Sequence, residues 1–197
     1  MPNHSALNRR RETPSAAQPS MRVWVKKSVA ALALAAGFVP LAPAQNAPAS
    51  AASEKLSATD QQFVQDAGTA GATEIAASKL ALSRSSDAQV KRFAQRMIAD
   101  HAKLARNLDV VAKRHGITAP ASADSSVVGS LQNLQGADFD KAYIEKVAVG
   151  GHQKAVELFK HESENGNDAQ LKGAAAKALP IIEHHYQMAQ QLAKARA

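Results

Sequence analysis

The sequence of 197 residues contains no cysteine. This absence excludes disulfide bonds, thiolate metal sites, cysteine nucleophiles and a lipid-modified cysteine anchor. The sequence also lacks the glycine-rich phosphate-binding motifs, the nucleophile elbow of serine hydrolases and any strand-like run. What remains is alanine-rich sequence with helical periodicity, which predicts an all-α protein with one domain and one core.

The apolar run at residues 28–39 is shorter than the roughly 20 residues that a membrane-spanning helix needs. A short basic region precedes this run, and small residues follow it at positions 42–44, which is the pattern of a secretory signal. We predict that residues 1–44 are an N-terminal extension and signal peptide, with the true start at Met21 and cleavage near Ala44. The mature protein would then lie in the periplasm or cell envelope; an uncleaved N-terminal anchor is the alternative.

The formal net charge of the chain is +7, but most of this excess belongs to the first 44 residues. These hold six of the 24 basic residues and one of the 17 acidic residues, which leaves 18 basic against 16 acidic residues and a net charge of +2. Because nucleic-acid binding needs a clustered basic face, we expect no nucleic-acid partner. We also expect no integral membrane span after signal cleavage, and as partners another envelope protein or a second copy of the chain.

Four helical patterns follow residues 45–58, a lead-in of small and polar residues that we expect to be flexible. The bundle domain is predicted over residues 59–196. Its helices should run from Thr59 or Asp60, either of which can cap the helix, to Arg84; from the segment after "SSD" to Arg114; from near Asp138 to "ENGND"; and from near Asp168 almost to the C-terminus. Pro180 lies inside the fourth helix and should kink it or interrupt a hydrogen bond.

The connections between these helices predict how they pack. Very short turns join the first helix to the second and the third to the fourth, so each pair should form an antiparallel hairpin. About twenty residues, in which "SSVVGSLQNL" is a candidate short helix, separate the hairpins and can run the length of a bundle. Two antiparallel hairpins joined by one long crossover form a ferritin-like four-helix bundle.

Each predicted helix carries one side chain on its apolar face that can bind a metal ion. These side chains are Glu74, His101, His152 and His185. Helical side chains lean toward their own N-terminus, so in antiparallel hairpins all four should converge near the middle of the bundle. A buried carboxylate is costly unless a metal ion, a protonated histidine or a proton compensates it. We predict that the four residues bind a single transition metal ion, which would be zinc, iron, copper or manganese.

The Glu-x-x-His motif of di-iron bundles is absent, because Ile98, Val149 and Ile182 stand three residues before the histidines. A site for one ion therefore fits better than a di-iron centre. Three further residues are candidates for supporting roles. Asp100 is a candidate partner of a histidine or of a surface cation, Glu145 is a candidate additional ligand or base, and Tyr143 is a candidate ligand for which packing with a hydrogen-bonded hydroxyl is the simpler interpretation.

Several short motifs occur in a fixed order along the chain. They are the pair Asp100 and His101, "FD..Y" at Phe139, Asp140 and Tyr143, the position of His152, and "LP....H" at Leu179, Pro180 and His185. Over about residues 59–194 the sequence resembles the domain of unknown function 4142 family (DUF4142), bacterial exported proteins with a ferritin-like bundle. Glu74 matches the first-helix glutamate of that family. The resemblance implies the fold and an envelope location, labelled periplasmic or outer membrane, of which we expect the former; it implies no reaction.

Three functions are consistent with these residues. The first is a periplasmic metal-binding bundle of uncharacterised function. The second is a non-catalytic envelope or stress-associated protein, structural or interacting with a partner, in which the buried polar cluster is structural and only sets the register of the bundle. The third, an acid–base enzyme that uses Glu74 and a histidine, lacks any recognisable nucleophile or substrate pocket. Whether the chain is an enzyme is left open, with a non-enzymatic role favoured.

Overall fold

The computed structural model describes residues 55–196, and every regular element in this range is a helix. The elements are α1 (Ala58–Arg84), α2 (Ala88–Arg114), α3 (Ser125–Gln132), α4 (Gly136–Tyr143), the π-helical turn η1 (Ile144–Val149), α5 (Gly150–Asn165) and α6 (Ala169–Lys194). The all-α prediction is confirmed. The predicted signal peptide and nearly all of the predicted lead-in lie outside the described residues.

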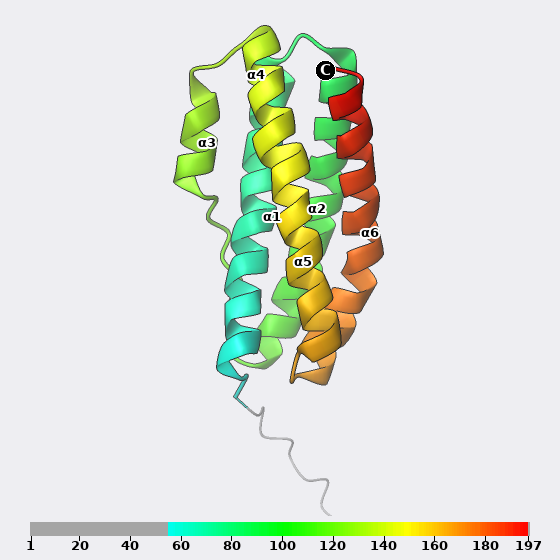
Figure 1. Ribbon diagram of the computed structural model, residues 1–197. Coiled ribbons are helices and arrows are strands. Elements are labelled where there is room, and N and C mark those ends of the chain that lie inside the picture. The colour runs from blue at the N-terminus through cyan, green and yellow to red at the C-terminus, as the bar shows by residue number, and fades with distance from the viewer. Residues whose placement is uncertain (1–54, 197) are drawn as a thin grey trace, which may run out of the picture. The chain divides into compact units, whose positions relative to one another are not determined.

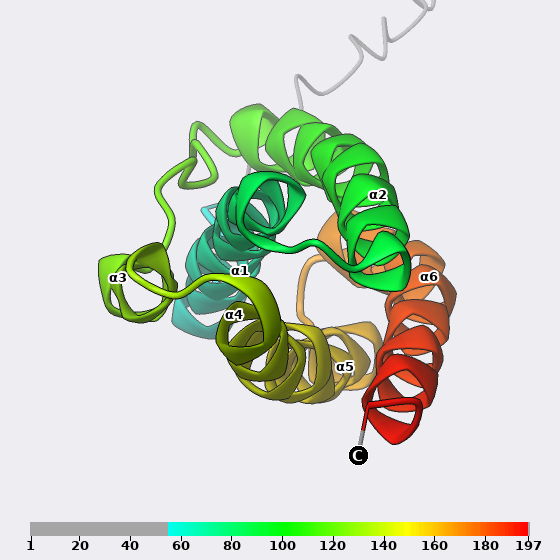
Figure 2. The same cartoon turned by 90° about the horizontal axis from the view of Figure 1, so that it is seen from above.

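The four long helices form the predicted ferritin-like bundle (Figure 1). One antiparallel hairpin consists of α1 and α2, and the other consists of α5 and α6, with α4 and η1 continuing α5 toward its N-terminus. Across the bundle α1 packs against α5, and α2 packs against α6. Each long helix therefore lies between two antiparallel neighbours, as the view along the bundle shows (Figure 2).

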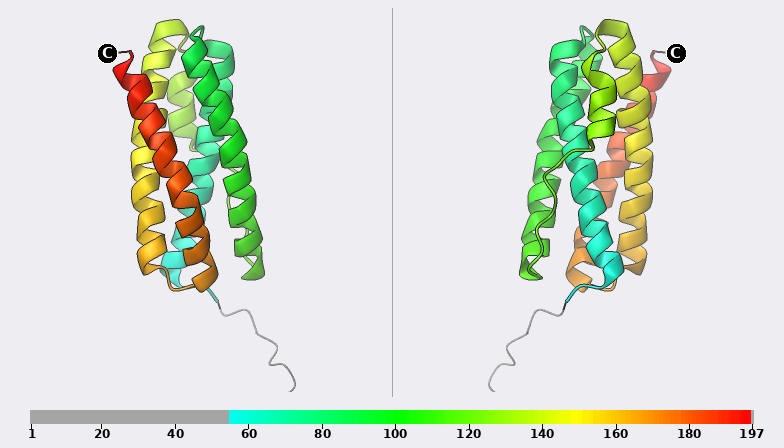
Figure 3. Two further views of the ribbon diagram at one scale, coloured as in Figure 1. Left: turned by 90° about the vertical axis from the view of Figure 1, so that its right-hand side faces the viewer. Right: turned by 90° about the vertical axis from the view of Figure 1, so that its left-hand side faces the viewer.

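The crossover between the hairpins runs along the outside of α1 (Figure 3). It contains the predicted short helix, α3, which packs against α1. The backbone N–H of Asp124 donates to Thr73 Oγ1 at 2.8 Å, which attaches the start of α3 to the bundle. Gly68 allows the crossover to approach closely, since a Cβ atom there would lie 2.6 Å from Pro120 Cδ.

The helix ends follow the expected chemistry with one correction. Asp87 and Asp168 cap α2 and α6, but α1 is capped by Ser57, whose hydroxyl accepts from the backbone N–H of Asp60 at 3.1 Å. Asp60 is therefore not the cap. Its carboxylate instead accepts the backbone N–H groups of Asn167 and Asp168, both at 3.0 Å, and so attaches the α5–α6 turn to the start of α1.

The apolar core is divided by a polar layer. One apolar cluster, which includes Phe93, Phe139 and Tyr143, fills the end of the bundle near the α1–α2 turn. Another, which includes Phe63 and Leu171, fills the opposite end. Between them, each long helix presents one buried ionisable side chain. Among residues 55–196, no helix combines the length and the apolar character needed to cross a membrane.

Candidate metal centre

The polar layer consists of the four residues predicted from the sequence. Glu74 comes from α1, His101 from α2, His152 from α5 and His185 from α6, and none is more than 4% exposed. The three imidazole rings form a nearly equilateral triangle, with centroids 5.3–5.5 Å apart. Helix phase and hairpin register have thus brought side chains more than a hundred positions apart in the sequence to one level of the bundle.

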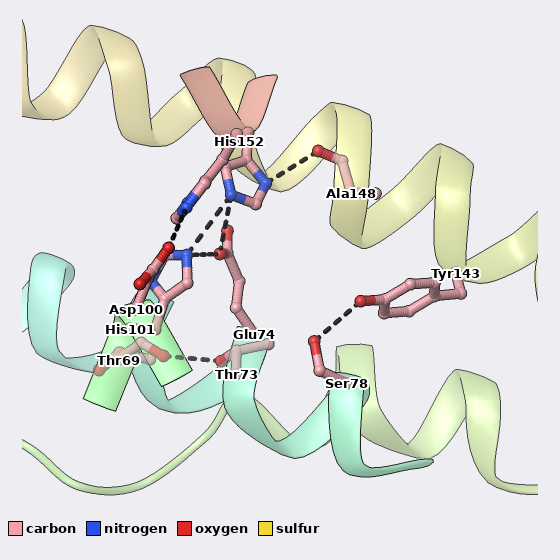
Figure 4. A network of polar contacts seen from close by, with 10 residues as sticks. Thr69, Thr73, Glu74, Ser78, Asp100, His101, Tyr143, Ala148 and His152 are labelled. Carbon is pink, nitrogen blue, oxygen red and sulfur yellow. Dashed lines mark hydrogen bonds and ion pairs between the residues drawn. The ribbon is translucent and has the colours of Figure 1, made fainter. Parts of the chain in front are cut away.

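Glu74 Oε2 lies at the centre of the contacts (Figure 4). It is 2.6 Å from His101 Nε2 and 3.2 Å from His152 Nε2, while the two Nε2 atoms are 3.4 Å apart. One nitrogen from each of the three histidines lies within 4.8 Å of one from each of the others. Three imidazoles and one carboxylate therefore converge at one level inside the bundle.

The second nitrogen of His152 fixes which atom of the ring faces this point. Nδ1 lies 2.9 Å from the carbonyl oxygen of Ala148, which can only accept, so Nδ1 carries the proton. In the neutral ring Nε2 is then a bare lone pair, directed at Glu74 Oε2 without a proton between them. Two electron-rich atoms at 3.2 Å repel each other unless a cation or a proton lies nearby.

His185 is oriented by Asp100 in a similar way. Its Nε2 lies 3.1 Å from Asp100 Oδ2. Burial raises the pKa of Asp100, but the contacts with Arg96 and His185 together outweigh this effect and hold the pKa below its ordinary value. The carboxylate is therefore charged and accepts the Nε2 proton of His185. His185 Nδ1 is buried and has no hydrogen-bond partner among the described residues. A carboxylate that holds the far nitrogen of an imidazole is a frequent arrangement behind metal-binding histidines.

The protonation states follow from burial and mutual contact. Burial raises the pKa of Glu74, but the adjacent His101 and His152 lower it below its ordinary value. Burial lowers the pKa of His101, yet the Glu74 carboxylate more than offsets this and raises it. For His152, and for His185 with a pKa of about 4, burial dominates and keeps the ring neutral. The layer thus holds one ion pair and two neutral imidazoles.

These distances agree with those between ligands of one metal ion. Two ligand atoms, each about 2.1 Å from an ion, lie about 3.0 Å apart at a right angle and about 3.4 Å apart at the tetrahedral angle. The contacts of His152 Nε2, at 3.2 and 3.4 Å, already have this spacing. The 2.6 Å contact between Glu74 and His101 would have to lengthen, when the proton it contains is replaced by the ion. A ring nitrogen of His185 lies within 4.8 Å of a nitrogen of each of the other two histidines. The donor set of imidazoles and one carboxylate suits zinc, iron, copper or manganese.

The helix that carries His152 is irregular just before it. In η1 the hydrogen bonds span five residues instead of four, and such turns frequently lie at functional sites. Two glycines follow η1, and a Cβ atom on Gly151 would lie 3.2 Å from Glu74 Oε1. The absence of a side chain there lets α5 approach the glutamate. Neither η1 nor the role of Gly151 was predicted, and the glycine pair at 150–151 was the one signal in the sequence.

The other candidates lie elsewhere. Glu145 is exposed and does not join the cluster, because η1 turns it away from the face of His152. Tyr143 is fully buried, but its hydroxyl lies 2.8 Å from Ser78 Oγ, so it has the packing role with a hydrogen-bonded tip and is not brought to the metal site (Figure 4). Asp100 does contact a histidine, as one of its two predicted roles required.

The comparisons with known proteins agree with this fold. A family model described as "Domain of unknown function (DUF4142)" matches residues 45–192. The chain belongs to this family. The chain is also similar to the crystal structure of a DUF305 fragment from Deinococcus radiodurans, with a TM-score of 0.61 and 17% sequence identity over 71% of this chain and 99% of that one. At this identity the likeness concerns the fold alone. No curated protein matches the chain significantly.

Proposed function

We propose that this DUF4142 protein is an exported protein of the bacterial cell envelope that binds one transition metal ion with Glu74, His101, His152 and His185. The observation that carries the proposal is the convergence of Glu74 with three buried imidazoles, in which the contacts of His152 Nε2 already have the spacing of ligands of one ion. The location is supported by the signal-like N-terminus, and by a family match that begins directly after the expected cleavage site.

The residues around the ligands favour binding to a pre-formed site. His152 is oriented by the Ala148 carbonyl, and His185 is oriented by Asp100, so neither ring has to be ordered when the ion arrives. Such supporting contacts typically change metal affinity 10- to 100-fold. The bound ion would supply a Lewis acid, or a redox centre if it were iron or copper. Glu74 would keep its negative charge in both states, first against protonated His101 and then against the ion.

A structural polar layer is the second candidate function, and one observation favours it. Each of the four side chains already contacts a polar partner, and the Glu74–His101 ion pair is internally neutral. A satisfied buried layer can set helix register without binding anything. The two candidates differ over His185 Nδ1, which has no hydrogen-bond partner among the described residues. A metal site would require this atom as the ligand, because Asp100 holds Nε2.

Titration calorimetry of the metal-free mature protein tests the proposal. In separate titrations, we expect the protein to bind one equivalent of Zn²⁺, Fe²⁺, Cu²⁺ or Mn²⁺. The affinity should be lowest for Mn²⁺, according to the general order of divalent affinities. His152→Ala should reduce Zn²⁺ affinity at least 100-fold. The matched control is His184→Ala, since His184 is exposed and adjacent to His185. Equal affinity of both variants, or no uptake by the wild type of any of the four ions, would refute the proposal.

A further inference from the structure

A small cavity lies beside Glu74 and His101 on the side of the layer that faces the α5–α6 turn. Its volume is about 30 Å³. Apart from those two residues it is lined only by apolar side chains and one glycine, including Ala67, Ala155 and Phe159. A space of this size has room for one or two small molecules, because a single water needs roughly 10–15 Å³ by the same measure.

The walls of this cavity are a poor environment for water. A buried water needs two to four polar partners. The cavity offers only Glu74 and His101, which already bind each other at 2.6 Å. Apolar cavities that water does not fill can take up small apolar molecules. The cavity is therefore suited to a small uncharged molecule in contact with two of the four residues of the layer.

A route from solvent leads to the cavity. A groove of about 580 Å³ lies between α2 and α6, which diverge toward the end of the bundle that carries the α5–α6 turn (Figure 3). Leu104, Leu108 and Phe159 line both the groove and the cavity, so they form the partition between the two. Leu104 and Phe159 are only half-buried, and movement of their side chains would open the partition.

We infer that the cavity binds an uncharged diatomic molecule, such as dioxygen, as an additional ligand of the ion, and that this molecule passes Leu104 and Phe159 from the α2–α6 groove. The inference rests on the proposed function. It requires a free coordination position toward the cavity, which four protein ligands leave open on iron because iron accepts five or six ligands. The inference adds two properties to the metal site, which are the class of external ligand that it takes and the path by which this ligand reaches it.

Nitric oxide is a suitable probe, since it is an uncharged diatomic that gives ferrous iron a distinctive electron paramagnetic resonance signal. The mature protein is loaded with Fe²⁺ without oxygen and titrated with nitric oxide. Ala67→Val adds two methyl groups to the cavity wall, and Ala72→Val is its matched control on α1, because Ala72 is half-buried and does not line the cavity. Leu104→Ala provides a change of opposite direction by opening the partition.

We expect the wild type and Ala72→Val to bind nitric oxide alike, and Ala67→Val to bind it at least tenfold more weakly with unchanged iron content. Leu104→Ala should speed association at least threefold. Iron present without a nitric oxide signal in the wild type, or an unchanged affinity in Ala67→Val and an unchanged rate in Leu104→Ala, would overturn the inference alone. Failure of the wild type to bind iron would overturn the metal site and this inference together.

Discussion

The ion pair between Glu74 and His101 can be tested without any metal, by replacing Glu74 with glutamine in the apo protein. In the wild type the carboxylate raises the pKa of His101, so the folded protein holds this imidazole charged. Glutamine removes the charge, and burial then lowers the pKa of His101. The folded variant therefore keeps the ring neutral at a pH where the unfolded chain, with an ordinary pKa of 6.5, binds a proton.

The sign and size of the effect follow from proton linkage. Unfolding of the variant takes up one proton below pH 6.5, which costs the folded state about 1.4 kcal/mol per pH unit. His101 of the wild type is protonated in both states at pH 5, so this residue contributes no slope there. The raised pKa of His101 also stabilises the wild type fully below pH 6.5 and progressively less above it. The loss of stability in the variant should thus be at least about 2 kcal/mol larger at pH 5.0 than at pH 7.5, where loss of the charged hydrogen bond costs about 1–3 kcal/mol.

Urea denaturation followed by circular dichroism, in the presence of a chelator, measures this difference. Glu145→Gln is the matched control, because the same substitution at an exposed position removes one charge without touching the layer. Its effect on stability should be within about 0.5 kcal/mol at both pH values. A loss for Glu74→Gln that is equal at pH 5.0 and pH 7.5 would show that His101 does not depend on this carboxylate for its charge.

Three further outcomes are expected. Asp100→Asn should weaken metal binding about 10- to 100-fold in calorimetry, because the contact that orients His185 is altered. Burial raises the pKa of Glu162 to about 7, so the contribution of this carboxyl to stability should fall as pH rises from about 4.5 to 7, by roughly 3 kcal/mol at most. In urea titrations the free energy of unfolding of Glu162→Gln should therefore gain on that of the wild type by up to this amount over the same range. Tyr143→Phe should cost about 1–3 kcal/mol in the same assay, since it leaves the buried Ser78 hydroxyl without its partner, whereas Tyr186→Phe, at a half-buried position, should cost less than 1 kcal/mol.

The convergence of the four ligand candidates could be predicted because it depends on regular geometry. Hairpin turns of known length and a repeat of 3.6 residues per turn are enough to place Glu74, His101, His152 and His185 at one level. The same reasoning was wrong for the orientation of Glu145. In a regular α-helix Glu145, seven residues before His152, would lie on the same face as the histidine. The extra residue in a π-helical turn rotates the residues before it by about 100° around the helix axis. The glycine pair at 150–151 is the one local signal near this turn, and it does not specify a π-helix.

Contacts between segments that are distant in the sequence could not be predicted from it either. Asp60 stands at a position that predicts a helix cap, and only the fold shows that its carboxylate receives the backbone of the α5–α6 turn, more than a hundred residues away. The burial of Glu162 without a hydrogen-bond partner among the described residues is similar, since its carboxylate lies close to Gly166 in the α5–α6 turn and interacts with Asp60 of α1. Helix periodicity gives the face of a residue, but the chemistry of that face depends on what packs against it.

Elemental analysis tests the central claim most directly. The protein would be expressed in its native host and purified without an affinity tag or chelator, beside a variant that carries both His101→Ala and His152→Ala. The account predicts close to one equivalent of zinc, iron, copper or manganese in the wild type and none in the double variant. A folded wild-type protein that contains none of these metals, and acquires none when each is supplied, would contradict it and leave the layer with a structural role.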